Sequence, residues 1–561
     1  MSPTVTPTLA PTLTIRDLNV AIGDVPILKG VSFEVPPGQV MGLVGESGSG
    51  KSMTALAIMG LLPPQSEASG DIQLQGVAVP YANDAAMRAI RGADVGMIFQ
   101  EPMTALNPLM TIGDQVAETI RIHTRAPPGA ALATAARMLE RVGLPNAEFP
   151  LGRFPHELSG GQRQRVAIAI AIALTPKLLI ADEPTTALDV TTQAQILTLL
   201  KTLIREDGMG MILITHDLAV VAETADRVAV MKAGEIVEQG PVGQMLANPA
   251  SGGMVHPYSR RLLADATHAP VRRSKPREGA PVLVVEGIVR EYPGVRRLFG
   301  RSPPKRAVDG VSFSIQPGES VGLVGESGCG KSTLLRTVLA LDRPQAGAVS
   351  VMGEDFTRAR GADLKRLRRH VQVVFQDPYG SFDPRWRVEQ LVAENFHLLD
   401  ERPDRAEGRR RVEAMLDQVG LSPADADRFP HEFSGGQRQR IAIARALITN
   451  PSIIALDEAV SALDVSIRAQ VLDLLADLSD RMGLSYLFVT HDLTVVRAIT
   501  DRLMVMQGGR IVETGPTEAV FTAPSHDYTR SLLAATPDLT RNILALDNPG
   551  GHHPTPQETE R

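Results

Sequence analysis

The chain has 561 residues, 43% of them hydrophobic, which is enough for several domains with buried cores. A formal net charge of −6 gives no general case for nucleic-acid binding, and the single cysteine excludes an internal disulfide and a cysteine-based metal cluster. The sequence has no apolar stretch long enough to span a bilayer and no secretory signal at its start, so we expect a soluble intracellular protein.

The first elements in the chain lead to a phosphate-binding pattern. A Pro- and Thr-rich stretch predicts a disordered tail over 1–12, and apolar segments at 13–15 and 31–35 predict strands. A buried strand is then predicted at 40–44, directly before GESGSGKS at 45–52, which fits G-x-x-x-x-G-K-[ST]. Ala- and Leu-rich sequence with helical spacing follows, so bound phosphates would lie at a helix N-terminus.

Each residue type in this pattern has a separate task. The glycines let backbone N–H groups turn toward phosphates, the lysine reaches the β- and γ-phosphates, and the serine hydroxyl coordinates Mg²⁺. The pattern recurs as GESGCGKS, again after an apolar run, which disfavours a chance Gly-rich turn. The predicted phosphate-binding residues are Gly45, Glu46, Ser47, Gly48, Ser49, Gly50, Lys51 and Ser52, then Gly325, Glu326, Ser327, Gly328, Cys329, Gly330, Lys331 and Ser332.

The repeat extends well beyond the phosphate loop. Segments containing FQ(E/D)P, SGGQRQR, a buried Asp-Glu pair and THDL all recur about 275 residues later. We therefore predict two tandem domains over 13–266 and 281–536. The Pro-rich, charged stretch between them predicts a linker at 267–280, and the polar C-terminus predicts a disordered tail at 537–561.

Each half has the pattern of an α/β fold. Apolar runs such as LLIAD and MILIT predict parallel strands among helices, and the sequence at 112–150 and 386–428 predicts a mostly helical insert. Together with the alternating early strands, this indicates an α/β core with a small antiparallel sheet. A basic stretch at 292–306 occurs only in the second half and predicts an exposed loop.

The motif order resembles that of the nucleotide-binding domains of ABC ATPases. The phosphate loop, FQ(E/D)P, SGGQ, DE and TH follow one another in each half, and SGGQ directly ahead of DE is specific to that family. The resemblance covers nearly the whole chain, twice. It implies two P-loop ATPase domains, each with a RecA-like parallel-sheet core, a small antiparallel β-subdomain and a helical subdomain, and it implies ATP and Mg²⁺ as ligands.

The resemblance also implies the roles of individual residues. Glu183 and Glu458 polarise the attacking water, and His216 and His491 contact the γ-phosphate. The predicted metal ligands are Ser52, Gln100, Asp182, Ser332, Gln376 and Asp457. The signature residues form a second anion site at a helix N-terminus, which in the family faces the ATP of the opposite domain: Ser159, Gly160, Gly161, Gln162, Ser434, Gly435, Gly436 and Gln437.

Some positions carry an alternative interpretation or depart from the family. Tyr292 fits the aromatic residue that stacks on adenine, whereas Ile22 stands near that place in the first half and predicts weaker stacking. Asp189 and Asp464 match the family's D-loop, with helix capping as the structural alternative. A small residue facing phosphate is the main interpretation of Cys329, and a redox sensor is the alternative. Ala459 replaces the usual proline after Glu458 and should be tolerated.

Two further segments resemble dipeptide and oligopeptide importers. HPYSRRLL and HDYTRSLL follow the two ATPase cores, although such a segment can also simply pack a helix. The resemblance implies the fused energy-coupling ATPase of a peptide importer, at the cytoplasmic face of the inner membrane. Its partners would be two permease subunits and an extracytoplasmic binding protein, with no nucleic acid. Because the Cys-rich segment of single-domain members is missing, no iron–sulfur cluster is expected.

Two other functions fit the motifs less well. A soluble tandem ABC ATPase acting on ribosomes or nucleic acid usually has a long charged helical linker, whereas this linker is short and Pro-rich. A fused sugar-importer ATPase often has one degenerate half, whereas both halves here are complete. The cargo is not encoded in these motifs.

Overall fold

The computed structural model describes residues 10–100, 105–186, 188–247, 253–273, 275–294, 303–461 and 463–547, and it divides into two compact units. The first unit contains the described residues up to Leu188, Thr192–Thr267 and those from Pro537 onward. The second contains Asp189–Thr191 and His268–Thr536. Among the described residues, no helix has both the length and the apolar character required to cross a membrane.

Each unit begins with a small antiparallel sheet, as predicted. In the first unit the strand order is β2-β1-β4-β5, and Leu13, Ile15, Leu18 and Val20 of one strand are buried. In the second unit the order is β12-β11-β14-β15. The strands are β1 (Leu13–Ile22), β2 (Val25–Val35), β4 (Ser66–Leu74), β5 (Val77–Ala78), β11 (Leu283–Tyr292), β12 (Lys305–Ile315), β14 (Ala346–Val351) and β15 (Glu354–Asp355).

The central sheet of each unit is parallel except for one edge strand. Its order is β10-β9-β3-β8-β7-β6 in the first unit and β20-β19-β13-β18-β17-β16 in the second. The strands are β3 (Val40–Val44), β6 (Val95–Ile98), β7 (Leu178–Asp182), β8 (Gly210–Ile214), β9 (Arg227–Lys232), β10 (Glu235–Pro241), β13 (Ser320–Val324), β16 (Val371–Val374), β17 (Ile453–Asp457), β18 (Ser485–Val489), β19 (Arg502–Gln507) and β20 (Arg510–Pro516).

This topology brings the repeated sequence motifs together at one edge of the central sheet. Strands β3, β7 and β8 are neighbours, and every residue in them is buried, which is typical of a sheet covered on both faces. The phosphate loop follows β3, the histidine lies just after β8, and the Asp-Glu pair begins with the last residue of β7. Because the strands are parallel, their carboxyl ends meet at one edge of the sheet, where ligands bind in open α/β folds.

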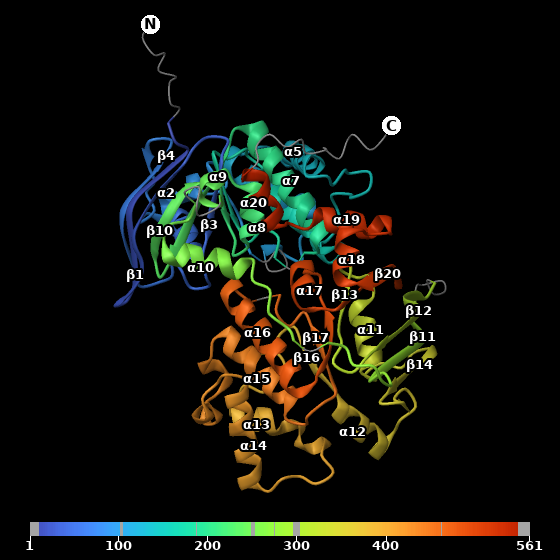
Figure 1. The fold of residues 1–561 in the computed structure, drawn as a ribbon. Coiled ribbons are helices and arrows are strands. Elements are labelled where there is room, and N and C mark those ends of the chain that lie inside the picture. The colour runs from blue at the N-terminus through green and yellow to red at the C-terminus, as the bar shows by residue number, and fades with distance from the viewer. Residues whose placement is uncertain are drawn as a thin grey trace. The chain divides into compact units, whose positions relative to one another are not determined.

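Helices cover the sheets and form the predicted helical insert (Figure 1). In the first unit α4 and α5 pack against α6, with Ile112, Val116, Leu139 and Val166 buried in one cluster. The first unit's helices are α1 (Lys51–Ile58), α2 (Asp84–Ile90), α4 (Ile112–Thr124), α5 (Pro128–Arg141), α6 (Gly160–Ala171), α7 (Val190–Asp207), α8 (Leu218–Thr224), α9 (Val242–Met245) and α10 (Pro257–Ala266). The second unit's are α11 (Lys331–Val338), α12 (Gly361–His370), α13 (Val388–Ala393), α14 (Arg405–Gln418), α15 (Gly435–Leu447), α16 (Val465–Met482), α17 (Leu493–Ile499), α18 (Thr517–Thr522) and α19 (Asp527–Ala535).

The structure differs from the sequence expectation at both predicted tails. Thr12 is buried and donates its N–H to the Val35 carbonyl at 2.8 Å, so it packs against the small sheet instead of forming part of a tail. Near the other end, α20 (Leu539–Asp547) forms where we predicted disorder; it contacts α8 and buries Leu539 (Figure 1). The rest of both predicted tails, 1–9 and 548–561, lies outside the described residues.

The predicted linker packs along the second unit. The Arg272 guanidinium donates to the Ile499 and Gly318 carbonyls and pairs with Asp501 at 2.9 Å. These contacts explain how a stretch without apolar periodicity acquires a defined path. In the predicted basic loop, the described residues end β11 and begin β12, and 295–302 lie outside the described residues.

Candidate active site

The phosphate loop of each unit connects a buried strand to a helix, and its first glycine is sterically required. Gly45 has φ 153°, and a Cβ added there would lie 2.2 Å from the Met231 carbonyl oxygen. Its counterpart Gly325 has φ 152°, and an added Cβ would lie 2.2 Å from the Met506 carbonyl oxygen. A side chain at either position would displace backbone, so the pattern encodes the close packing of the loop as well as its phosphate contacts.

The two lysines of the loops are held over the loop backbone. Lys51 is buried, and its Nζ donates to the carbonyls of Gly45 at 2.7 Å and Glu46 at 2.8 Å. Lys331 makes the corresponding bonds to Gly325 at 2.5 Å and Glu326 at 3.0 Å. Each ammonium group therefore lies inside the loop at the N-terminus of a helix, where an anion is stabilised by both the charge and the helix dipole.

The aspartates that end β7 and β17 are buried carboxylates. Ser52 Oγ donates to Asp182 Oδ1 at 3.3 Å, which joins the end of β7 to the first turn of α1. Burial raises the pKa of Asp182, and it raises the pKa of Asp457 to about 6, with the neighbouring Glu458 adding to the effect. Burial makes the charge of the carboxylate unfavourable unless a cation balances it. A serine hydroxyl and a carboxylate are also the oxygen ligands that a hard divalent cation prefers.

The next residue in each unit is a glutamate whose carboxylate is held by polar side chains, three in the first unit and two in the second. His216 Nδ1 lies 3.0 Å from Glu183 Oε1, and the Gln100 amide and the Thr186 hydroxyl donate to Oε2 at 2.8 and 2.9 Å. Burial acts to raise the pKa of Glu183, but these bonds outweigh it and lower the pKa to about 2. This glutamate is therefore ionised and oriented, as a group that activates water must be.

The second unit repeats this arrangement. His491 Nδ1 lies 3.0 Å from Glu458 Oε1, and the Gln376 amide donates to Oε2 at 2.7 Å. Burial opposes both charges, yet the contact between the two side chains lowers the pKa of Glu458 and raises that of His491. Glu183 and Glu458 also have φ of 46° and 48°, a strained conformation that non-glycine residues adopt mainly where function or packing demands it.

These contacts also refine the sequence prediction. Gln100 and Gln376 were predicted as metal ligands, and here their amide nitrogens contact the glutamates, which leaves the amide oxygen as the ligand atom each could offer. Thr186 was not singled out from the sequence. The corresponding hydroxyl in the second unit, Ser461, donates to the Glu458 backbone carbonyl at 2.8 Å instead, so repeat alignment alone does not identify this role.

The signature segments cap helices α6 and α15. Ser159 Oγ accepts from the Gln162 N–H at 3.3 Å, while Gln162 Oε1 accepts from the Ser159 N–H at 2.9 Å. Ser434 and Gln437 form the same reciprocal pair. Ser159 and Ser434 are exposed, so each unit presents a capped helix N-terminus to its surroundings.

The remaining predicted positions have the following surroundings. Tyr292 ends β11 and is 37% exposed, with Arg290 4.8 Å from its ring centroid, whereas Ile22 ends β1. Asp464 is the N-cap residue of α16. Burial raises the pKa of the Cys329 thiol, which disfavours the thiolate that a redox sensor requires.

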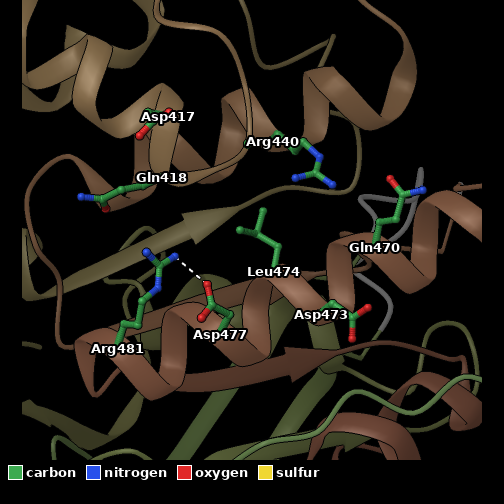
Figure 2. A pocket seen from close by; sticks show the side chains of 9 residues that line it. Asp417, Gln418, Arg440, Gln470, Asp473, Leu474, Asp477 and Arg481 are labelled. Carbon is green, nitrogen blue, oxygen red and sulfur yellow. Dashed lines mark ion pairs between the residues drawn. The ribbon is translucent and has the colours of Figure 1, made fainter.

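A groove of about 490 Å³ lies on the second unit outside this site (Figure 2). Its side chains come from α14, α15 and α16, and Arg481 pairs with Asp477 at 2.7 Å. The residues that line it are Asp417, Gln418, Gly420, Arg440, Gln470, Asp473, Leu474, Asp477 and Arg481. None of them is a predicted ATPase residue.

The ABC transporter family model matches residues 28–186 and 308–461. The chain belongs to the ABC transporter family. The model for the C-terminal region of oligopeptide and dipeptide transporters also matches, over residues 512–561. This match confirms the prediction, made from the motif order, of an ATP-hydrolysing ABC protein with two ABC ATPase domains.

Curated relatives match this ABC chain along almost its whole length. The glutathione import ATP-binding protein GsiA of Salmonella choleraesuis (strain SC-B67) is 46% identical over 98% of this chain and 94% of its own length. The protein of the same name from Escherichia coli (strain K12) is 46% identical over 94% of this chain and 89% of its own.

Solved ABC structures are similar to part of this chain. One is cbiO1 from Clostridium perfringens, part of the ABC transporter complex cbiONQ, with 27% identity, a TM-score of 0.38 and coverage of 44% of this chain and 92% of its own. Another is a post-hydrolysis dimer of the ATP-binding cassette MJ0796 with ADP and phosphate, with 28% identity, a TM-score of 0.38 and coverage of 42% and 98%.

The buried charge of Asp457 predicts a pH-dependent stability. Because its pKa is raised to about 6, the stability that this group contributes is present below its unfolded pKa near 4 and is lost as pH rises through 6. We expect Asp457→Asn to raise the Tm of the nucleotide- and Mg²⁺-free protein by about 2–6 °C at pH 8 and by about half as much at pH 5. Differential scanning calorimetry at both pH values measures this.

Asp400→Asn is the matched control, because it removes the same charge from a side chain that is 82% exposed. It should leave Tm unchanged at either pH. A fall in the Tm of the Asp457→Asn protein at pH 8 would contradict the expectation and show that the ionised carboxylate stabilises the fold.

Proposed function

We propose that this protein is the energy-coupling ATPase of a membrane importer for glutathione or related small peptides, with both ATPase domains in one chain. The observation that carries the proposal is the 46% identity to glutathione import ATP-binding proteins over 98% of the chain. Both halves retain a complete set of motif residues, as a chain that drives an importer without a second ATPase subunit requires.

The chemistry proposed for each unit follows from its side chains. Lys51 would exchange its bonds with the loop carbonyls for bonds with the β- and γ-phosphates. Ser52, Asp182 and the Gln100 amide oxygen would hold Mg²⁺, which when bound neutralises phosphate charge. Glu183 would accept a proton from the attacking water, and His216 would keep that carboxylate oriented while its ring contacts the γ-phosphate.

We further propose that each ATP is shared by the two domains. Lys51 would bind the phosphates of one ATP and the signature at Ser434 would cap its γ-phosphate, with Lys331 and Ser159 sharing the other. The exposed, capped N-termini of α6 and α15 support this, because such a terminus is an anion site. ATP binding would then close the domains and hydrolysis would open them.

The proposed partners are two permease subunits and, through them, an extracytoplasmic binding protein, which would place this chain at the cytoplasmic face of the inner membrane. The test is an affinity pull-down of the tagged Glu183→Gln/Glu458→Gln protein with ATP from detergent-solubilised membranes. Co-purification of two multi-span permeases would support the proposal, and the binding of glutathione to the binding protein encoded beside them would identify the cargo. Recovery of ribosomal proteins would favour a soluble tandem ATPase instead.

The two ATP sites should differ in affinity because only the second has the predicted adenine-stacking tyrosine. Base–aromatic stacking contributes ~1–3 kcal/mol, so Tyr292→Ile should weaken ATP binding at the second site roughly tenfold. Ile22→Tyr should strengthen binding at the first site by a similar factor. Each is measured by calorimetry with the other site disabled, by Lys51→Ala or Lys331→Ala respectively. Equal affinities in the parent proteins would contradict the assignment.

A further inference from the structure

The two C-terminal segments that resemble those of peptide importers reach the phosphate loops of their own units. In the first unit, the Tyr258 hydroxyl accepts a hydrogen bond from the Glu46 N–H at 3.2 Å, across 212 residues of sequence. In the second, the Tyr528 hydroxyl accepts from the Glu326 N–H at 3.0 Å, across 202 residues. Glu46 and Glu326 are the second residues of the two loops, so the same bond occurs twice in one chain.

A hydrogen-bonded turn, present in both units, holds each tyrosine in place. In the first unit the Glu238 carboxylate accepts from the N–H groups of Val255 at 2.7 Å and His256 at 3.1 Å. His256 Nδ1 then accepts from the Tyr258 N–H at 3.2 Å and so caps helix α10. The His-Pro-Tyr sequence therefore has a structural role. The histidine caps the N-terminus of the helix, and the tyrosine side chain extends from the helix to the phosphate loop.

The second unit builds the same turn from its own residues. The Glu513 carboxylate accepts from the N–H groups of Ser525 at 2.7 Å and His526 at 3.1 Å, and His526 Nδ1 accepts from the Tyr528 N–H at 3.1 Å. Burial acts to raise the pKa of Glu513, but these and other hydrogen bonds lower it to about 2, so the anchor is ionised at neutral pH.

Both tyrosines are buried. Tyr528 belongs to a buried cluster with Val324, the last residue of β13, and with Leu493 and Val496 of α17. Tyr258 is 7% exposed, with the Lys232 ammonium 4.9 Å from its ring centroid. Burial raises the pKa of Tyr528 to about 12, so its hydroxyl stays protonated and accepts through its oxygen.

The second residue of each loop is held from both sides. The Glu46 N–H is bound by the tyrosine, and the Glu46 carbonyl accepts from the Lys51 ammonium at 2.8 Å and from the Ser49 N–H at 3.2 Å. When phosphate draws the ammonium away from the Glu46 carbonyl, the tyrosine still holds the N–H of the same residue. A loop that keeps its shape as the lysine moves loses less conformational entropy on binding.

We propose that Tyr258 and Tyr528 are positioning residues, through which each C-terminal segment holds the phosphate loop of its own domain ready for nucleotide. The segments thus act on ATP affinity, and their tyrosines touch loop backbone rather than nucleotide. The proposal depends on the ATPase activity of the family and is independent of the transported cargo.

The test measures MgADP affinity at one site at a time in the full-length chain. Tyr258→Phe is made with Lys331→Ala, and Tyr528→Phe with Lys51→Ala, so that one intact loop remains in each protein. Loss of one hydrogen bond should weaken MgADP binding about 2- to 10-fold by isothermal titration calorimetry. In the otherwise unaltered chain, each Phe variant should raise the KM for ATP by a similar factor and leave kcat within about twofold.

Matched controls separate positioning from packing. Tyr486→Phe deletes a buried hydroxyl that donates to the Leu475 carbonyl at 2.9 Å. Tyr81→Phe deletes an exposed hydroxyl that donates to the Gly70 carbonyl at 2.9 Å. These controls should leave MgADP affinity unchanged. Glu513→Gln, which weakens the anchoring turn without altering the tyrosine, should weaken binding in the same direction as Tyr528→Phe. Unchanged affinity in both positioning variants, or an equal loss in the controls, would overturn the proposal.

Discussion

Replacing both Glu183 and Glu458 with glutamine should lower ATP hydrolysis by ~10²–10⁴-fold, the usual contribution of a positioned general base. The carboxylates are ionised, as the lowered pKa of each indicates, and each is oriented by a histidine at 3.0 Å. Glutamine keeps the shape of the side chain but cannot accept the proton, so ATP should remain bound. The measurement is steady-state phosphate release together with the amount of nucleotide that co-purifies with the protein.

The single variants and a surface control make this result specific. Glu183→Gln alone should also reduce turnover if both sites hydrolyse ATP, and unchanged turnover would show that the first site is not hydrolytic. Glu206→Gln, at a side chain that is 57% exposed and pairs with Arg141, should have no effect. Wild-type hydrolysis by the double variant would remove both glutamates from the role of base.

Placing a carboxylate at both signature serines should abolish most hydrolysis without unfolding the protein. Aspartate caps helix N-termini about as well as serine, so Ser159→Asp and Ser434→Asp preserve α6 and α15. If each serine faces the γ-phosphate of a shared ATP, the new carboxylate repels that phosphate. Loss of a single hydrogen-bond donor to the transition state already lowers an enzyme's rate by ~10²–10³-fold. We expect at least a ~100-fold fall in hydrolysis with MgADP affinity unchanged.

MgADP affinity is the informative comparison, because ADP lacks the γ-phosphate that the signature would contact. Ser422→Asp is the matched control, since Ser422 also caps a helical segment by accepting from the Ala424 N–H. That variant should hydrolyse ATP at the normal rate. Normal hydrolysis by the Ser159→Asp/Ser434→Asp protein would contradict the shared-site proposal and leave each domain with a self-contained ATP site.

Local sequence was sufficient to predict the strands and helices that depend only on the residue pattern of a short segment. The apolar runs at 40–44 and 178–182 form β3 and β7, and the helical pattern after 112 forms α4 and α5. The repeated motifs identified the two ATPase domains because phosphate binding demands particular residue types at a fixed spacing. Parallel order in the central sheet then follows from strands that alternate with helices.

Long-range contacts decided the remaining features. Helix α20 was missed because its nine residues are too short to be stable alone, and contact with α8 supplies the stabilisation that propensity lacks. The path of the predicted linker depends on the bonds from Arg272 to Ile499 and Gly318. The bonds from Tyr258 to Glu46 and from Tyr528 to Glu326 join residues more than 200 positions apart. The sequence by itself determined the chemistry of the site, and only the tertiary structure decided which distant side chains hold that site in place, because no short-range pattern records such contacts.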